Sequence, residues 1–257
     1  MNKQLQEQIR CRLYLNSVLG ALPKLLRLSS EAVDLLGDNH FSIKFSTMSG
    51  LHATVVFRDG GAAFHDGNDV PADINLFFVS DTQVNNLFSQ EGISVPLPVK
   101  GIFQMKKIKV FKNLADLLQR YLKPTPEDLE DNEFKNCHVQ ILLGLAVRSL
   151  CQLGTYDPDA KQHLGSMSGM AEFIIGDDFE PAWIMNTEGK FECGFGKSPS
   201  KPDVIINFEN TQVALDALND TIDVNAEVGL GKIKVSGLVP LADKLGLLMQ
   251  RIPLYIQ

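Results

Sequence analysis

The sequence predicts an α+β protein made of two tandem copies of one unit, each a five-stranded, mainly antiparallel sheet covered by helices. The first observation is a strand and an apolar helix near the end of the chain. Residues 232–235 alternate between polar and apolar, and leucines then recur at helical spacing from Leu241 to Leu248. The second observation is that part of this pattern occurs twice, because the Lys-Ile-Lys-Val of residues 107–110 is identical to that of 232–235.

Further matches support a duplication. Thr82-Gln-Val84 matches Thr211-Gln-Val213 at a shift of 129 residues (211 − 82), and Asp59-Gly60 matches Glu188-Gly189 at the same shift (188 − 59). One shift over several elements is typical of an internal repeat. We therefore divide the 257 residues into a divergent first copy, 1–123, and a clearer second copy, 124–257, each of ordinary domain size.

The first copy is expected to begin with helix from Leu5 to Leu36, divided at Pro23. Asp81 is expected to cap a short helix that ends near Phe88. Residues 91–101, with two prolines, are expected to form a loop before a fifth strand around Ile108 and a closing helix. The four earlier strands are predicted at 41–45, where apolar and polar residues alternate, and at 53–57, 62–64 and 73–79.

The second copy is expected to repeat this order. It starts with a helix that ends near Leu153, followed by a short helical piece at 160–164 and a helix around Leu215. Strands are expected around Phe173, Ile184, Phe191, Ile205 and Ile233, before the closing helix. The fourth strand of each copy is apolar on both faces, which predicts cover on both sides, by the sister copy or by a second chain.

Composition excludes several classes of protein. With 24 basic against 31 acidic residues, the chain is expected to repel nucleic acid and anionic membranes. The longest apolar run, Ile141–Val147, is too short to span a bilayer, and the first ten residues do not have the pattern of a signal peptide. The four cysteines form no Cys-x-x-Cys pair, which favours reduced thiols. We therefore expect a cytoplasmic protein.

Catalytic patterns are missing from the sequence. The five histidines are scattered over different predicted elements, and no paired carboxylates share a face. Gly229-Leu-Gly231 has Lys234 where a dinucleotide-binding loop needs its third glycine, and it leads into a strand instead of out of one. We expect no enzymatic activity, no cofactor and no metal.

The second copy resembles the sterol carrier protein type 2 domain. The features that carry the resemblance are the order of elements, Asp203 at the start of the fourth strand, and Gly231-Lys-Ile-Lys-Val-Ser-Gly237 as the fifth. The first copy matches less clearly from Phe41 to Leu122, because Phe111-Lys112 stands where the glycine should end the fifth strand. The two matches cover about two thirds of the chain.

In that family an apolar tunnel for fatty acyl chains, acyl-CoA or sterols lies between the sheet and its helices. The resemblance therefore implies a non-enzymatic protein that binds or carries a fatty acyl, sterol-like or isoprenoid ligand. Trp183, the only tryptophan, is expected on the second strand of the second copy as a contact for the ligand. The other implied wall residues of that copy are Leu215, Leu218, Ile233, Val235, Leu241, Leu245, Leu248 and Met249.

The resemblance also implies wall residues in the first copy: Leu87, Phe88, Ile108, Val110, Leu114, Leu117, Leu118 and Tyr121. This copy is expected to fill its own interior with Phe88, Phe103 and Phe111, which leaves the second copy as the ligand site. The alternative is that these apolar residues are ordinary core. The chain would then be a structural or accessory module that binds another protein or a second copy of itself.

Overall fold

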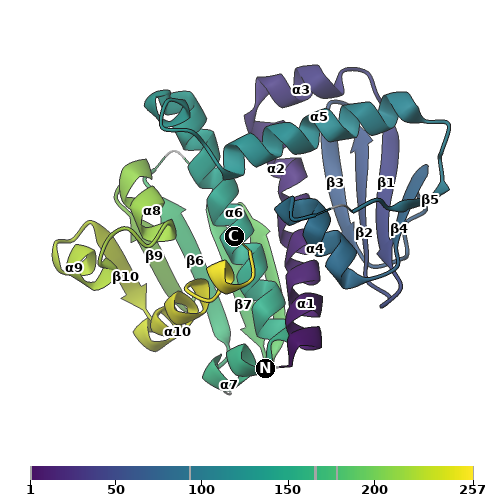
Figure 1. The fold of residues 1–257 in the computed structure, drawn as a ribbon. Coiled ribbons are helices and arrows are strands. Elements are labelled where there is room, and N and C mark those ends of the chain that lie inside the picture. The colour runs from purple at the N-terminus through teal and green to yellow at the C-terminus, as the bar shows by residue number, and fades with distance from the viewer. Residues whose placement is uncertain (1, 93, 165–166, 178, 257) are drawn as a thin grey trace. The chain divides into compact units, whose positions relative to one another are not determined.

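Two sheets with the same strand order organise the chain (Figure 1). The computed structural model describes residues 2–92, 94–164, 167–177 and 179–256. The chain up to Leu129 forms one unit and Glu130–Leu254 the other. The strands of the first unit are β1 (Phe41–Thr47), β2 (His52–Arg58), β3 (Gly61–Asp66), β4 (Ile74–Phe78) and β5 (Leu97–Lys100). Those of the second are β6 (Gly169–Ile175), β7 (Ala182–Thr187), β8 (Lys190–Phe195), β9 (Val204–Phe208) and β10 (Ile233–Gly237).

The spatial order of strands is β3-β2-β1-β4-β5 in the first sheet and β8-β7-β6-β9-β10 in the second. In each sheet the first and fourth strands in sequence pair in parallel, and all the other pairs are antiparallel. The predicted fold class and the tandem repeat are therefore confirmed.

Helices form the second layer of each unit. The first unit has α1 (Lys3–Arg12), a π-helical turn (Leu13–Val18), a 3₁₀ turn (Leu19–Ala21), α2 (Leu22–Leu28), α3 (Ser30–Leu36), α4 (Asp81–Ser89), α5 (Met105–Leu122) and a 3₁₀ turn (Asp128–Glu130). The second has α6 (Asn132–Tyr156), α7 (Pro158–Leu164), α8 (Thr211–Leu218), α9 (Val224–Gly229), α10 (Val239–Met249) and a 3₁₀ turn (Ile252–Leu254).

The sequence predicted that the helical segment at the start of the chain would be divided at Pro23. The helical backbone instead continues through this residue. Pro23 lies in the first turn of α2, where its missing N–H costs nothing, and helical backbone continues to Leu28. The break is at Ser29, which has extended backbone angles. Its Oγ accepts a hydrogen bond from the N–H of Ala32 and so caps α3.

The fifth strand of the first unit is also not where the sequence predicted it. Residues 107–110 lie in helix α5, because their four-residue alternation is outweighed by a helical stripe that begins at Ile108 and Phe111 and continues into the buried Leu114 and Leu118. The strand is instead Leu97–Lys100, in the segment expected to be a loop. It is the edge strand next to β4 and is exposed along its length, so it lacks the apolar alternation of a half-buried strand.

Gly101, directly after β5, is the glycine that the first copy was expected to lack. Gly101 follows β5 and Gly237 ends β10, with φ angles of +83° and +107°. A Cβ on Gly101 would lie 2.7 Å from the carbonyl oxygen of Asp73, and one on Gly237 would overlap that of Asp203. Both units therefore need a glycine at this point, because the backbone of the neighbouring strand passes so close.

The two aspartates of these contacts also have matching roles. The Asp73 Oδ2 accepts a hydrogen bond of 2.9 Å from the N–H of Ser42, and the Asp203 Oδ2 accepts one of 2.8 Å from that of Met170. Each carboxylate thereby fastens the start of the fourth strand to the first. This is the parallel pair, which no short turn connects.

The sequence matches suggested a constant shift in residue number between equivalent positions of the two units. In the structure this shift varies along the chain. It is 128 residues between Ile43 and Ala171 (171 − 43), which occupy the same ladder position. It rises to 129 at the turns of Asp59 and Glu188, both with positive φ, and to 130 (203 − 73) at the aspartates. The connections from the first strand to the second and from the third to the fourth have thus each gained one residue, whereas the turn between the second and third strands has kept its length.

The helix after the fourth strand is capped one residue earlier than expected. Ser80, not Asp81, accepts a hydrogen bond from the N–H of Gln83. Asn210 does the same for Val213 in the second unit. Asp81 instead accepts a hydrogen bond of 2.6 Å from the hydroxyl of Ser49.

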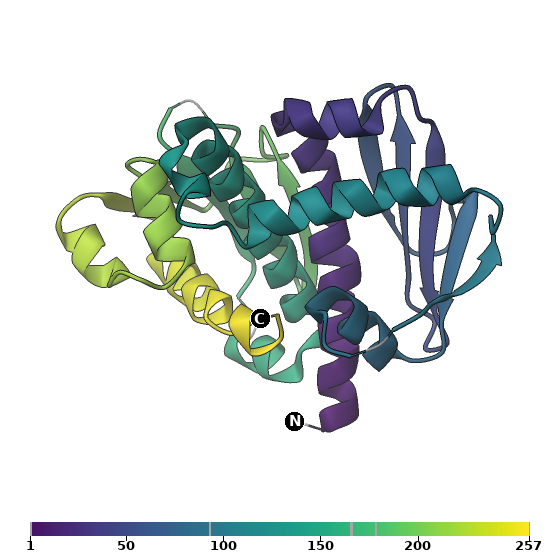
Figure 2. The ribbon, with the colours of Figure 1, turned by 45° about the horizontal axis from the view of Figure 1, so that its top comes forward.

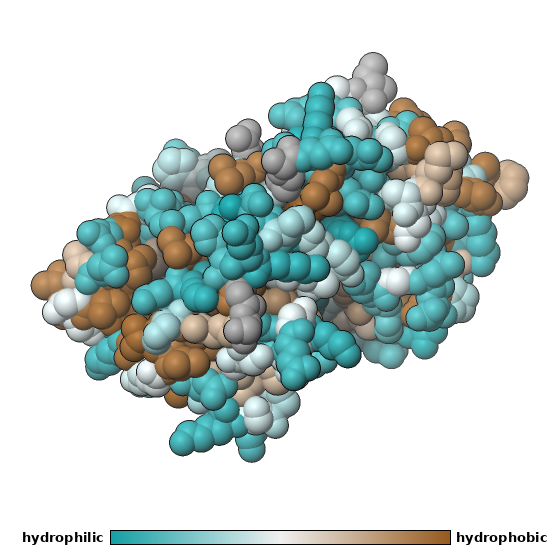
Figure 3. All heavy atoms as spheres, turned by 90° about the horizontal axis from the view of Figure 1, so that it is seen from below, coloured by the Kyte–Doolittle hydropathy of each residue, from teal (hydrophilic) through white to brown (hydrophobic). Residues whose placement is uncertain are grey.

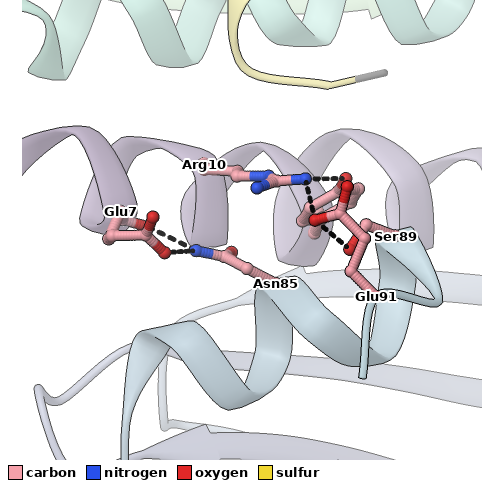
Figure 4. A network of polar contacts seen from close by, with 6 residues as sticks. Glu7, Arg10, Asn85, Ser89 and Glu91 are labelled. Carbon is pink, nitrogen blue, oxygen red and sulfur yellow. Dashed lines mark hydrogen bonds and ion pairs between the residues drawn. The ribbon is translucent and has the colours of Figure 1, made fainter. Parts of the chain in front are cut away.

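Helix α4 is held against α1 by a buried amide (Figure 4). The Nδ2 of Asn85 donates to the carbonyl of Glu7 at 3.0 Å and to its carboxylate at 2.7 Å. Nearby, Arg10 reaches the Glu91 carboxylate at 3.5 Å. Asn85 is fully buried, so its amide has no access to water as a replacement partner.

We expect Asn85→Ala to lower the free energy of unfolding by about 1–2 kcal/mol, because it leaves the Glu7 groups without this donor. Urea denaturation followed by circular dichroism measures the change. Thr82→Ala, on the exposed side of the same helix, serves as the control and is expected to change stability by less than about 0.5 kcal/mol. Equal effects of the two variants would contradict this role for Asn85.

Burial differs between the two faces of each sheet. In β9, Val204, Ile206 and Phe208 are buried, whereas Ile205 and Asn207 on the other face are half-buried. The same holds for β4, with Ile74 and Phe78 buried and Phe77 half-buried. The residues on the other face are half-buried and not fully solvated, so cover of this face by the sister copy or by a second chain stays a prediction.

Helix α6 is the longest helix of the second unit. Within the described ranges, it is the one helix long and apolar enough to cross a membrane by length and composition. It contains the apolar run Ile141–Val147, and 72% of its most apolar stretch is buried inside the protein. Burial of this extent is typical of a core helix.

Candidate functional site

The helix-covered face of the second sheet is the site to which the sequence points. Strand register places alternate residues of each strand on this face, since successive side chains point to opposite sides. Its centre is built from two parallel strands, β6 and β9, flanked by β7 and β10. The buried residues on this face are Ala171, Phe173, Ile175, Ala182, Ile184, Val204, Ile206, Phe208 and Ile233.

Helices α6, α8 and α10 form the opposite wall. Helix α10, yellow in Figures 1 and 2, packs against β6, β9, β10 and α6, and α8 packs against α6 and β9. Pro240 starts the first turn of α10, and its leucines follow at spacings of four and three residues, which puts them on one side. Leu241, Leu245 and Leu248 are accordingly buried against the sheet.

Eight of the nine residues implied by the sequence lie on elements of this interior. Leu215, Ile233, Leu241, Leu245 and Leu248 are buried. Val235 lies on the same face of β10 as Ile233 and is half-buried. Leu218 and Met249 are half-buried near the ends of α8 and α10.

Trp183 lies on the other face of the sheet. It pairs with Glu172, whereas its neighbour Ile184 pairs with the buried Ala171 of the helix-covered face. Its ring covers Gly194, where a Cβ would come within 2.5 Å of Trp183 Cζ2. The expectation that Trp183 contacts a ligand between sheet and helices is therefore not met. Both faces of β7 are apolar here, so alternation could not show which side the ring occupies.

The sequence reasoning missed two glycines on α6. A Cβ on Gly144 would lie 3.0 Å from the ring of Phe195, and one on Gly154 would lie 2.7 Å from the ring of Phe191. The glycines let two aromatic rings of the edge strand β8 pack directly on the helix. Glycine inside a helical pattern, ten residues apart here, was the available signal, because it usually has a packing reason.

Two thiols lie in the same layer between α6 and β8. The Sγ of Cys151 donates to the carbonyl of Phe191 at 3.2 Å. A hydrogen bond with Cys193, followed by burial, raises the pKa of the Cys151 thiol far above its usual range. The same hydrogen bond lowers the pKa of Cys193. Cys151 therefore remains a protonated thiol at neutral pH and acts here as a small apolar group with one weak donor.

Polar groups are few on this face. Asn186 is buried at the end of β7, where its Nδ2 donates to the carbonyl of Met167 at 2.6 Å and its Oδ1 accepts from the N–H of Gly189. Among the residues that the structure describes, no group of three or more His, Cys, Asp or Glu could hold a metal ion. The arrangement is suited to an apolar molecule.

The corresponding interior of the first unit contains a cluster of aromatic rings. Phe45 lies 6.2 Å from Phe88 and 5.6 Å from Phe111, measured between ring centroids, and Phe88 stacks on Tyr14 at 5.2 Å. Phe88 and Phe111 are half-buried and pack against Phe45, and their filling of this interior stays a prediction. The prediction is wrong for Phe103, which is 98% exposed.

Only some of the remaining wall residues implied for the first unit are buried. Leu114, Leu117, Leu118 and Tyr121 are buried on α5. Ile108 and Val110 belong to the same helix and not to a strand, and Leu87 is exposed on α4.

Equivalent ladder positions differ in size between the units. Ile43 of the first unit corresponds to Ala171, and the stacked pair Phe41 and Phe57 corresponds to Gly169 and Asn186. Next to Gly169, Leu241 of α10 approaches so closely that a Cβ on this glycine would lie 3.0 Å from its Cδ2. At the positions of Gly169, Ala171 and Asn186 the second unit carries smaller side chains than the first, whereas Phe173 matches Phe45 in size.

No model of a protein family matches this sequence, and no curated protein matches it. Among solved structures, a palmitated sterol carrier protein 2-like 2 protein of Aedes aegypti is 21% identical, over 40% of this chain and 91% of that one, with a TM-score of 0.31. The chain is similar in fold to sterol carrier proteins. The sterol carrier protein domain 2 of Helicoverpa armigera gives 19% identity over 43% and 87%, with a TM-score of 0.32.

Each of these two matches covers less than half of this chain. A stereoselective inverting sec-alkylsulfatase of Pseudomonas sp. also shares structure with the chain. It is 11% identical, over 56% of this chain and 28% of the sulfatase, with a TM-score of 0.31.

Proposed function

We propose that this protein binds and carries an apolar, lipid-like ligand, a fatty acyl, sterol-like or isoprenoid molecule, in a tunnel between the second sheet and its helices. The supporting observation is the difference in side-chain size at matched positions. Ala171 and Asn186 stand where the first unit has Ile43 and Phe57. An apolar interior with few polar groups favours such a ligand, since burial of apolar surface contributes about 25 cal/mol per Å².

The proposed role is non-enzymatic, and the residues proposed to contact the ligand are those of α8, α10 and β10. They are Leu215, Leu218, Ile233, Val235, Leu241, Leu245, Leu248 and Met249. We further infer a cytoplasmic location, which the four free cysteines support.

Native mass spectrometry of the purified protein and extraction of its bound lipid test the proposal directly. Titration with a fluorescent fatty acid then gives an affinity from the emission of the ligand. The emission of Trp183 is a poorer reporter, because this residue lies on the opposite face of the sheet. No co-purified molecule together with no saturable uptake would refute the proposal.

A size-swap variant locates the ligand. We expect Ala171→Phe to weaken fatty-acid binding by about tenfold or more, because the new ring takes the space of the acyl chain. Ile43→Phe, at the matched position in the first unit, is the control and is expected to leave binding unchanged. If both variants bind as well as the wild type, the ligand does not lie in the second unit.

The second candidate function is an accessory module that binds another protein or a second copy of the chain. Half-buried apolar residues on the face of the second sheet opposite its helices, Ile174, Trp183 and Ile205, favour it. Light scattering distinguishes the two. A stable dimer or complex that Trp183→Ser disrupts, with no lipid bound to the wild type, would support the accessory role.

A further inference from the structure

The segment from Val95 to Met105 exposes an unusual series of apolar side chains in the first unit. It contains β5 and the turn into α5, and its tip, Phe103, is 98% exposed. In Figure 3 hydrophobic atoms gather at the right-hand edge, the side on which Figure 1 draws β5. The exposed apolar residues are Val95, Leu97, Val99, Ile102, Phe103 and Met105.

Polar contacts hold this segment in place. The Lys100 ammonium donates to the carbonyl of Ala72 at 2.5 Å, and the Gln104 side-chain amide donates to the carbonyl of Asp73 at 3.3 Å. The N–H of Gln104 also bonds the carbonyl of Gly101 at 2.9 Å, which closes a tight turn. Ile102 and Phe103 lie at the tip of this turn, so the backbone directs them outward and keeps them from collapsing onto the sheet.

Between Glu91 and Asp116 the sequence of this segment and of the start of α5 carries charge of one sign. Residues 92–115 contain five lysines and no aspartate or glutamate, although the whole chain has a net charge of −7. Three of these lysines, Lys106, Lys109 and Lys112, are exposed in the first two turns of α5. Their spacing of three residues keeps them near one another on the helix surface.

We propose that the Val95–Met105 segment docks on an anionic lipid bilayer. Ile102, Phe103 and Met105 enter the boundary between headgroups and acyl chains, and the lysines of α5 bind anionic headgroups. Net negative charge does not prevent this, because fields fall off within a Debye length of about 8 Å at physiological salt. The proposal does not depend on a ligand in the second unit.

The segment is less suited to a protein partner that would add a strand to β5. Pro96 and Pro98 remove backbone donors on this edge, and Lys100 marks its end, as in strands protected against such pairing. An exposed apolar tip with a basic surround instead matches the chemistry of an interface between water and anionic lipid.

Flotation with vesicles of phosphatidylcholine, with and without phosphatidylglycerol, tests the proposal. We expect binding only to the vesicles that contain phosphatidylglycerol, and weaker binding at high salt. Phe103→Ser is expected to reduce binding about tenfold, and Lys106→Ala with Lys109→Ala about twentyfold. Because these side chains are exposed, circular dichroism of the variants is expected to match the wild type.

Matched controls lie in the second unit. Leu230→Ser removes a side chain that is 67% exposed, and Lys161→Ala removes an exposed lysine on α7, and both are expected to bind as the wild type does. Absence of vesicle binding by the wild type, or equal binding to neutral vesicles, would overturn the proposal. So would a wild-type oligomer in solution that Phe103→Ser dissociates without any change in vesicle binding.

Discussion

Gly237→Ala is expected to lower the free energy of unfolding by about 3–5 kcal/mol. The φ angle of Gly237 is +107°, which an alanine adopts only under strain. The added Cβ would also overlap the Asp203 carbonyl oxygen and lie 3.2 Å from the Cα of Val204. These are backbone atoms of a central strand, so they cannot move aside as a flexible side chain could. Urea denaturation, with separate fits if the units unfold in two steps, measures the loss.

Gly246→Ala is the matched control, because it lies in the adjoining helix α10 with no other atom within 4 Å of its added Cβ. We expect it to leave stability unchanged or to raise it by up to about 1 kcal/mol. Gly101→Ala is expected to reproduce the loss in the first unit. Equal stability of Gly237→Ala and Gly246→Ala would contradict the close approach of β10 to Asp203.

Asp157→Ala is expected to lower the free energy of unfolding by about 3–4 kcal/mol. The Asp157 side chain is fully buried, and its carboxylate accepts hydrogen bonds from the N–H groups of Asp159 and Ala160 and from Arg251 at 3.0 Å. Removing it uncaps α7 and takes from the Arg251 guanidinium its buried anionic partner. The midpoint of urea denaturation measures the loss.

Asp159→Ala tests the same guanidinium from its exposed side. Asp159 lies 3.2 Å from Arg251, but its side chain is 54% exposed, so we expect a loss below about 1 kcal/mol. If Asp157→Ala lowers the free energy of unfolding no more than Asp159→Ala does, the buried ion pair between Asp157 and Arg251 does not stabilise the second unit as proposed.

Side-chain periodicity predicted the first strand of the chain, where Phe41, Ile43 and Phe45 alternate with Ser42 and Lys44. It failed at residues 107–110, where four alternating residues form part of a longer helical stripe. It also failed at Leu97–Lys100, because an exposed edge strand has no buried face to mark.

The candidate site was predictable in part for the same reason. The leucines of α10 repeat at helical spacing and were placed correctly on one buried face. Trp183 was not, since apolar residues on both faces of β7 leave the direction of its side chain undetermined. The fit of Phe191 and Phe195 onto the glycines of α6 joins residues about 40 or more positions apart. Such contacts depend on tertiary packing, which a single sequence does not encode locally.

The carboxylates of Asp73 and Asp203, which clamp the fourth strand of each sheet to the first, have a consequence for folding during synthesis on the ribosome. Every strand of the first sheet lies between residues 41 and 100, and both partners of its clamp, Ser42 and Asp73, emerge early. The leading half can therefore complete its sheet while the trailing half is still being translated. When the first repeat folds before the second has been synthesised, its strands have no similar unfolded partner in the same chain. This order of folding protects tandem repeats against exchange of strands between domains.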